Sequence, residues 1–179
     1  MYKGKRVIHI VAAGLNGEIG CNNELLWRIR ADLQFFKQST LGHTVLMGSN
    51  TVNSLPKPLE CRAVVKLSRK YTGEFSRYLC DLGILKHYLN KCVEISDMLN
   101  TDCIFVAGGA SVYEQTLPYV DEVWMTHVLG SFPHADTFYK SPEGFETIFK
   151  SETEIALQAD LANGNDLEYY FTKSMNIPY

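Results

Sequence analysis

Four short runs of the chain are almost continuously apolar instead of alternating between apolar and polar residues. They are VIHIVAA (7–13), TVLMG (44–48), AVVKL (63–67) and CIFVAGG (103–109). Such runs are typical of central strands that are covered on both faces, so they predict the α/β class. Strands are expected at 6–13, 44–47, 62–67, 92–95, 103–107, 121–129, 145–156 and 166–173.

Helical spacing is readable between some of these strands. Within 31–40 the apolar Leu33 and Phe36 lie three residues apart, on one face of a helix. A second helix is expected at 110–117, which ends before a proline. A shorter helix is expected to begin near 49–51, where three residues of good capping type follow a glycine.

The last part of the chain has a different pattern. The tripeptide Asn163-Gly164-Asn165 is typical of a hairpin turn, and apolar residues alternate from Leu167 to Phe171. We therefore expect an antiparallel pair to close an otherwise largely parallel sheet. In the stretch 69–91, residues 78–88 could form a helix, but they contain Gly83 and an uneven apolar pattern, so the stretch remains an excursion of uncertain structure.

Composition narrows the classes of function. The chain has 179 residues, 46% hydrophobic and 21% charged, which fits one globular domain. The chain has 17 Lys and Arg against 20 Asp and Glu, and this net charge of −3 argues against an extended binding surface for nucleic acid. The five cysteines are scattered and never spaced Cys-x-x-Cys, which argues against a disulfide framework and a zinc knuckle. Reduced thiols in the cytoplasm are the simplest interpretation.

The N-terminal region resembles a secretory signal only superficially. Three basic residues precede the apolar run 7–13, but this run is at the short limit for a signal and contains His9. It is better interpreted as the first buried strand. No stretch is long and apolar enough to cross a bilayer, and no histidine spacing is typical of a metal site. We expect no membrane partner and no metal.

Two segments share the order strand, glycine, helix. They are VLMGSNT (45–51) and IFVAGGASVY (104–113). Glycine lets a backbone approach a ligand closely, and the free amides at a helix start favour phosphate, so two such turns side by side could hold a pyrophosphate. Each turn alone is more often a tight connection, and neither matches the G-x-G-x-x-G fingerprint of the Rossmann fold.

Two charged residues have two interpretations each. Asp32 begins an apolar helix, where it is either a carboxylate stabilised by the helix dipole or one that faces an apolar pocket. In the pocket its pKa would rise and it could pair with an amidine-like heterocycle. Arg62 opens a strand, either as a solvated charge or as a fork for a substrate carboxylate. For each residue taken alone, the first interpretation is the more common one.

Several short motifs follow one another over nearly the whole chain apart from 69–91. They are IHIVAA (8–13), IG (19–20), Trp27, ADL (31–33), FK (36–37), VLMG (45–48) with Thr51, Arg62, VAGG (106–109), VYEQ (112–115), TH (126–127) and ADTF (135–138). In this order they resemble the dihydrofolate reductase family. The resemblance implies a single domain over 1–179, with a mixed, mostly parallel eight-stranded sheet, flanking helices, an antiparallel C-terminal hairpin and a cleft between nucleotide and pterin sites.

The resemblance also implies an activity and its catalytic residues. The reaction is the NADPH-dependent reduction of 7,8-dihydrofolate to tetrahydrofolate, which supports thymidylate synthesis and one-carbon metabolism. A hydride goes to C6 of the pterin and a proton to N5. Asp32 would hold the pterin N3 and 2-amino group, Thr126 would bridge to it, and Trp27 would order a water. Antifolate inhibitors would share the substrate's site.

Binding residues are implied in the same way. The pterin and benzoyl groups would pack on Leu25, Leu33, Phe36, Leu55 and Leu59. Arg62 would pair with the glutamate carboxylate. The cofactor would contact Ala13, Ile19, Gly20, Gly48, Ser49, Asn50, Thr51, Leu67, Ser68, Arg69, Ala107, Gly108, Gly109, Ala110, Ser111, Val112 and Tyr113. The Gly108-Gly109 bond would be cis, and the loop 14–26 would be a mobile lid.

The sequence departs from the family pattern at three places. Leu26 stands where a proline usually precedes the tryptophan. Ser49 and Asn50 follow Gly48 where a basic residue often reads the 2′-phosphate, so Arg69 or Lys70 is the alternative source of charge for NADPH rather than NADH. The stretch 69–91 is longer than in compact bacterial relatives, which leaves the adenine contacts unassigned.

Two alternatives stay open at this stage. The first is the pyrimidine reductase of riboflavin synthesis, which has the same fold and glycine turns but a ribosylated pyrimidine as substrate. This substrate gives no reason for Asp32 and Arg62 to occur together. The second is a non-catalytic nucleotide-binding or assembly protein. We expect a monomeric reductase with dihydrofolate as its small-molecule partner.

Overall fold

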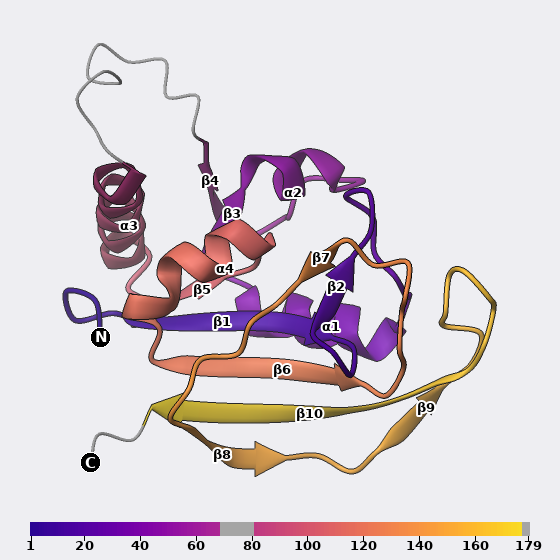
Figure 1. Ribbon diagram of the computed structural model, residues 1–179. Coiled ribbons are helices and arrows are strands. Elements are labelled where there is room, and N and C mark those ends of the chain that lie inside the picture. Colours follow the sequence, from indigo (N-terminus) through magenta and orange to yellow (C-terminus); the bar gives the residue numbers. More distant parts are fainter. Residues whose placement is uncertain (69–80, 177–179) are drawn as a thin grey trace.

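The computed structural model describes residues 1–68 and 81–176 of the chain (Figure 1). In these ranges eight strands form one sheet in the order β4-β3-β5-β1-β6-β10-β8, with β9 paired to β10. The strands are β1 (Arg6–Ala13), β3 (Thr44–Gly48), β4 (Ala63–Leu67), β5 (Cys103–Val106), β6 (Glu122–Val128), β8 (Phe145–Lys150), β9 (Glu154–Ala156) and β10 (Leu167–Asn176). A separate two-stranded sheet consists of β2 (Glu18–Gly20) and β7 (Thr137–Phe138).

The sheet is parallel at one end and antiparallel at the other. Strands β4, β3, β5, β1 and β6 pair in parallel, whereas β10 is antiparallel to β6, β8 and β9. The helices are α1 (Arg30–Thr40), α2 (Ser49–Ser54), α3 (Asp81–Met98), α4 (Ala110–Thr116) and the short 3-10 turn η2 (Leu117–Tyr119). This architecture confirms the predicted α/β class and the mixed, mostly parallel sheet of eight strands.

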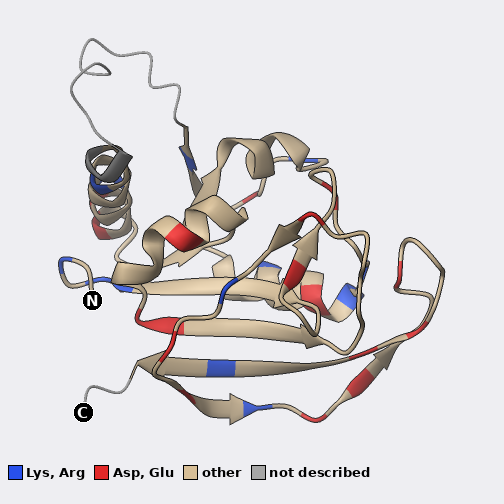
Figure 2. Ribbon diagram, in the orientation of Figure 1, with Lys and Arg blue, Asp and Glu red and all other residues tan. Residues whose placement is uncertain are grey.

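Helices on both faces explain the continuously apolar strands. Along β1, Val7 and Val11 belong to the core cluster that also contains α3 and α4 residues. The alternate residues Ile8 and Ile10 belong to a second cluster, with Phe35 from α1 packed against it. Successive side chains of a strand point to opposite faces, so a strand with two covered faces needs apolar residues at nearly every position. Charged residues are correspondingly scarce in β1, β3 and β5 (Figure 2).

The predicted strand at 92–95 is wrong, because these residues lie inside α3. Leu85, Leu89 and Cys92 are each at most 1% exposed and follow helical spacing toward the sheet. The apolar run is too short to distinguish a strand from a helix by its own periodicity, and the pattern that decides begins upstream. In the stretch 69–91, whose structure the sequence did not predict, the residues from Asp81 onward belong to α3. Residues 69–80 lie outside the described part of the chain.

The predicted strand at 145–156 is two strands, β8 and β9, on either side of residues 151–153. Both pair with β10, so the expected antiparallel closure of the sheet is confirmed. The connection from β9 to β10 is longer than the predicted tight turn. Within it Asp160 accepts hydrogen bonds from the backbone N–H groups of Ala162 and Asn163, at 2.9 and 3.2 Å.

Candidate active site

Asp32 and Thr126 meet at the carboxyl end of β6. Asp32 lies in the first turn of α1, and its Oδ1 accepts a hydrogen bond from Oγ1 of Thr126 at 2.7 Å. Thr126 is 1% exposed and is placed by pairing on both sides, opposite Ala12 of β1 and Phe171 of β10. A hydrogen bond thus joins a carboxylate on α1 to a hydroxyl whose position the pairing of β6 fixes.

The surroundings of Asp32 decide between its two interpretations. Burial raises the pKa of the Asp32 carboxyl, and the Thr126 hydrogen bond only partly offsets this. The cap residue Ile29 makes no side-chain hydrogen bond to the helix start. A carboxylate whose main role was to stabilise the helix dipole would have a lowered pKa instead. Asp32 is therefore a desolvated carboxylate beside a buried hydroxyl.

Tyr113 of α4 lies at the same end of the sheet. Its hydroxyl donates a 2.7 Å hydrogen bond to the carbonyl oxygen of Ile10 in β1. Burial raises the pKa of the Tyr113 phenol well above its usual value, and Tyr139 and the charge of Asp32 add to this effect. Tyr113 is thus a neutral hydroxyl at neutral pH.

The two predicted glycine turns touch each other. The N–H of Gly48 donates a 2.8 Å hydrogen bond to the carbonyl oxygen of Gly108. A Cβ on Gly48 would lie 3.0 Å from Cγ2 of Val112, and one on Gly109 would lie 3.3 Å from Oγ1 of Thr51. The Gly108-Gly109 bond is cis, as the resemblance implies. The first turns of α2 and α4 therefore lie side by side.

The other residues expected on the nucleotide side are distributed around these turns. Leu67 is 6% exposed and pairs with Gly48 at the end of β4, next to Ser68. Ser49 and Asn50 form the first turn of α2, and Asn50 lines a hollow together with Asn23. Ala107 follows β5, Ala110 and Ser111 begin α4, and Ala13, Ile19 and Gly20 lie at the end of β1 and in β2. Arg69 and Lys70 lie outside the described residues.

The apolar residues expected on the substrate side surround α1. Phe36, Leu55 and Leu59 pack against the core cluster that contains Ile8 and Ile10 of β1. Leu33 and Leu25 are 42% and 58% exposed.

Arg62 precedes β4 and lies at the far end of this apolar surface. Its guanidinium carbon is 6.0 Å from the centre of the Phe36 ring, and its Nε donates to the carbonyl oxygen of Glu60 at 2.9 Å. No carboxylate of the described residues forms an ion pair with Arg62. Its terminal nitrogens are therefore available to an anionic ligand.

Trp27 is buried in a third core cluster, together with Leu26 and Phe132. It is 3% exposed, and its ring centre lies 4.9 Å from that of Phe132. The flanking backbone is held by the β9–β10 connection, because the N–H of Arg28 donates to Ala159 at 2.8 Å and that of Leu161 donates to Leu26 at 3.1 Å. The structure thus fixes the C-terminal end of the loop 14–26 firmly.

Glu18 is a site-region residue that sequence reasoning missed. It is 2% exposed, and its carboxylate accepts hydrogen bonds from the backbone N–H of Asn16 at 2.7 Å and from that of Phe132 at 3.1 Å. Asp136 similarly accepts from the N–H of Asn22 at 2.8 Å. Both carboxylates tie the loop 14–26 to the segment before β7. No local signal marks Glu18, and Asp136 is noticeable only as part of the motif ADTF (135–138), because each carboxylate contacts a residue more than a hundred positions away.

Comparisons with known proteins identify one family. A family model described as dihydrofolate reductase matches residues 6–174. A dihydrofolate reductase from Bacillus subtilis is 30% identical over 167 residues, which cover 93% of this chain and 94% of the relative. One from Staphylococcus haemolyticus is 26% identical, over 96% of each chain. One from Mycoplasma pneumoniae is 37% identical over 125 residues, which cover 69% of this chain and 76% of the relative.

Proposed function

The chain belongs to the dihydrofolate reductase family, and from that membership we propose how its own residues carry out the reaction. The activity is the reduction of dihydrofolate by an NADP-dependent enzyme. This decides against the pyrimidine reductase and the non-catalytic protein that the sequence alone left open. The proposal concerns the roles of individual residues, the choice of NADPH, the monomeric state and the binding of antifolate inhibitors at the same site.

The hydrogen bond between Thr126 and Asp32 carries the proposal. Asp32 presents a carboxylate to the cleft, and a pterin carries two neighbouring N–H donors on N3 and its 2-amino group. A carboxylate accepts such a pair in bidentate fashion, as it does with guanidinium. Thr126 fixes one carboxylate oxygen at 2.7 Å and so sets the plane in which the pterin lies.

The raised pKa of Asp32 fits a role in protonation. Reduction of dihydrofolate adds a hydride to C6 and a proton to N5, and a negative charge at Asp32 favours the protonated pterin. A carboxylate that exchanges protons closer to neutrality is better matched to this step than an ordinary surface carboxylate. Trp27, beside Asp32's helix, orders a water on the proton's path.

The rest of the substrate follows the apolar surface of α1. Leu33 and Phe36 of the helix, with Leu25, Leu55 and Leu59, enclose the pterin and benzoyl groups. Arg62 then receives the glutamate carboxylate in a bidentate pair, since its guanidinium has no carboxylate partner among the described residues. Charge and apolar surface therefore follow the order of groups along the folate molecule.

The nucleotide side fits NADPH. The touching turns at Gly48 and Gly109 leave backbone amides at the starts of α2 and α4 without a side-chain cap, and such amides suit phosphate. A side chain at Gly48 would press on Val112, so the close approach requires glycine there. When bound, NADPH supplies the hydride. Ala13, Ile19, Gly20 and Tyr113 hold the nicotinamide half, and the loop 14–26 closes over it and excludes water.

The test is NADPH oxidation by purified protein with and without dihydrofolate, repeated with NADH. We expect oxidation that depends on dihydrofolate and is faster with NADPH. Asp32→Asn should lower turnover at neutral pH by orders of magnitude while leaving cofactor binding nearly intact. Asp97→Asn is the matched control, because this carboxylate is 64% exposed on α3. Unchanged turnover in Asp32→Asn would remove Asp32 from its role.

A further inference from the structure

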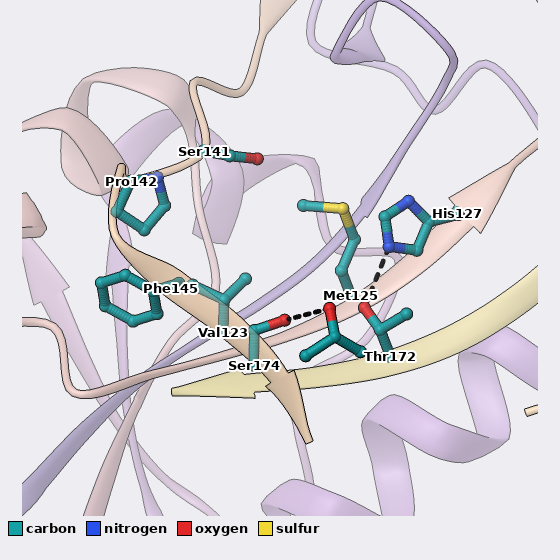
Figure 3. Close-up of a pocket in the computed structure, with 9 residues that line it drawn as sticks. Val123, Met125, His127, Ser141, Pro142, Phe145, Thr172 and Ser174 are labelled. Atoms are coloured by element: carbon teal, nitrogen blue, oxygen red, sulfur yellow. Dashed lines mark hydrogen bonds between the residues drawn. The ribbon is translucent and has the colours of Figure 1, made fainter. Parts of the chain in front are cut away.

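A cavity of about 130 Å³ is lined by side chains of β6, β8 and β10 (Figure 3). Side chains alternate along β6, so Trp124 and Thr126 point toward α1. Met125 and His127 point to the other face, where they line the cavity. Further walls come from β8, β10 and the segment that precedes β8. The cavity is therefore separated from the proposed substrate site by the sheet itself.

The lining has an apolar part and a polar part. Val123, Met125 and Phe145 provide the apolar part. In the polar part, Nε2 of His127 is 2.9 Å from Oγ1 of Thr172, and Oγ1 of Thr147 is 3.2 Å from Oγ of Ser174. The second pair is longer than a usual hydroxyl–hydroxyl bond, and either hydroxyl can be its donor. Each of these hydroxyls can also donate to, or accept from, a ligand hydroxyl beside it.

The cavity offers no charged side chain to a ligand. None of its lining residues is Asp, Glu, Lys or Arg, and burial together with the nearby Lys150 lowers the pKa of His127, so the imidazole is neutral at neutral pH. The Lys150 ammonium is engaged over the Tyr170 ring, 4.4 Å from its centre, and Tyr170 stacks on His127 at 4.6 Å. Dihydrofolate and NADPH carry several negative charges, so neither fits here.

The size of the cavity defines the ligand further. The cavity is half open to solvent, and an enclosed apolar cavity of about 150 Å³ accommodates one benzene ring. A volume of about 130 Å³ therefore suits a single small ring, and the hydroxyl pair favours a ring with one hydroxyl group over a bare hydrocarbon.

Two cavity residues flank Thr126 in the chain. Met125 and His127 are its immediate neighbours, so a ligand that displaces their side chains acts on the same three residues of β6. The hydroxyl of Thr126 is held to Asp32 at 2.7 Å on the other face. Packed strands transmit small displacements because the core has little free volume. A ligand that shifts these side chains would therefore act on the strand that positions the Thr126 hydroxyl beside Asp32.

We propose that this cavity is a second binding site, for an uncharged single-ring compound with one hydroxyl group, and that its occupation changes turnover through β6. The regulatory part rests on the proposed roles of Asp32 and Thr126, whereas the binding part does not.

Phenol is the probe for binding, and methionine methyl groups labelled with ¹³C report it by NMR. Met125→Leu assigns the Met125 signal. We expect phenol to shift this signal in a saturable manner and benzenesulfonate, an anionic ring, to leave it unchanged. Ser174→Ala should weaken phenol binding about fivefold through the loss of one hydrogen bond. Absence of a saturable shift, or equal binding of benzenesulfonate, would overturn the proposal.

Two matched variants test the location. Ser141 is an exposed residue of the lining, and Ser141→Trp should block the cavity and abolish the Met125 shift. Lys140→Trp adds the same side chain at the neighbouring exposed position, outside the lining, and should leave binding intact. Equal phenol affinity in both variants would mean that the ring binds elsewhere.

Kinetics test the regulatory part. We expect phenol to change the rate of dihydrofolate reduction about fivefold in the wild type and in Lys140→Trp, and not in Ser141→Trp. A saturable Met125 shift with unchanged turnover would overturn regulation and leave the binding site. Absence of turnover in the wild type without phenol would instead contradict the proposed function.

Discussion

The hydroxyl of Thr126 and the carboxylate of Asp32 are joined by a 2.7 Å hydrogen bond across 94 positions of the chain. Thr126→Val keeps the shape of the side chain and removes the donor. Because this bond lowers the pKa of Asp32 against the effect of burial, the variant should raise that pKa further. We expect the acidic limb of the kcat/KM profile to move to higher pH and the maximum to fall about tenfold. Thr101→Val is the control, since its hydroxyl contacts Ser96 instead.

The raised pKa of Asp32 also predicts a stability effect. A carboxyl whose folded-state pKa lies above its ordinary value of 3.8 favours folding at low pH, and this contribution is lost as the pH rises through the folded-state pKa. Without ligands, Asp32→Asn should therefore have a higher Tm than the wild type at pH 7. The difference should shrink as the pH falls toward about 4. Thermal unfolding at several pH values checks this, and equal Tm values at pH 7 would contradict the desolvation of Asp32.

Arg62→Leu should raise the KM for dihydrofolate about tenfold to a hundredfold and leave kcat nearly unchanged, because it removes a binding contact remote from the reacting atoms. A dihydropterin without the benzoylglutamate tail provides the second measurement. The wild type and the variant should reduce it equally well. Lys86→Leu, at an exposed position of α3, is the charge-matched control. A wild-type KM in Arg62→Leu would refute the assignment.

The contact between α2 and α4 can be tested by a pair of substitutions. A Cβ at Gly48 would lie 3.0 Å from Cγ2 of Val112, so Gly48→Ala should push α4 away and raise the KM for NADPH severalfold. Val112→Ala removes the opposing methyl groups. The double variant Gly48→Ala/Val112→Ala should recover part of the lost NADPH affinity, measured by direct titration. Additive losses would mean that the glycine acts through something other than this contact.

Glu18 should govern the opening of the loop 14–26. Burial acts to raise the pKa of Glu18, but hydrogen bonds from Asn16 and the Phe132 backbone outweigh it and hold the pKa below its usual value. The carboxylate's stabilisation of the loop is thus present above about pH 4.5 and is lost as the pH falls through the lowered pKa. Glu18→Gln should speed amide hydrogen exchange in this loop about tenfold at neutral pH. Glu24→Gln, exposed in the same loop, should not.

Local patterns were sufficient to predict most of the sheet. The strands at 6–13, 44–47 and 103–107 are readable because burial on both faces leaves continuous apolar runs in the sequence. The segment at 92–95 misled because four residues carry too little periodicity to separate a strand from the last turns of a buried helix. The helical spacing that decides its conformation starts upstream, at the buried Leu85 and Leu89 of α3.

The sequence by itself determined the α/β class, the strand-glycine-helix turns and the order of motifs that led to the family, because each of these is encoded within a few neighbouring residues. Only the tertiary structure decided that Asp32 is a desolvated carboxylate held by Thr126, that Gly48 and Gly108 touch, and that Glu18 fastens a loop to Phe132. Each of these contacts joins distant parts of the chain. Their energies depend on burial and distance, and no local pattern records either quantity.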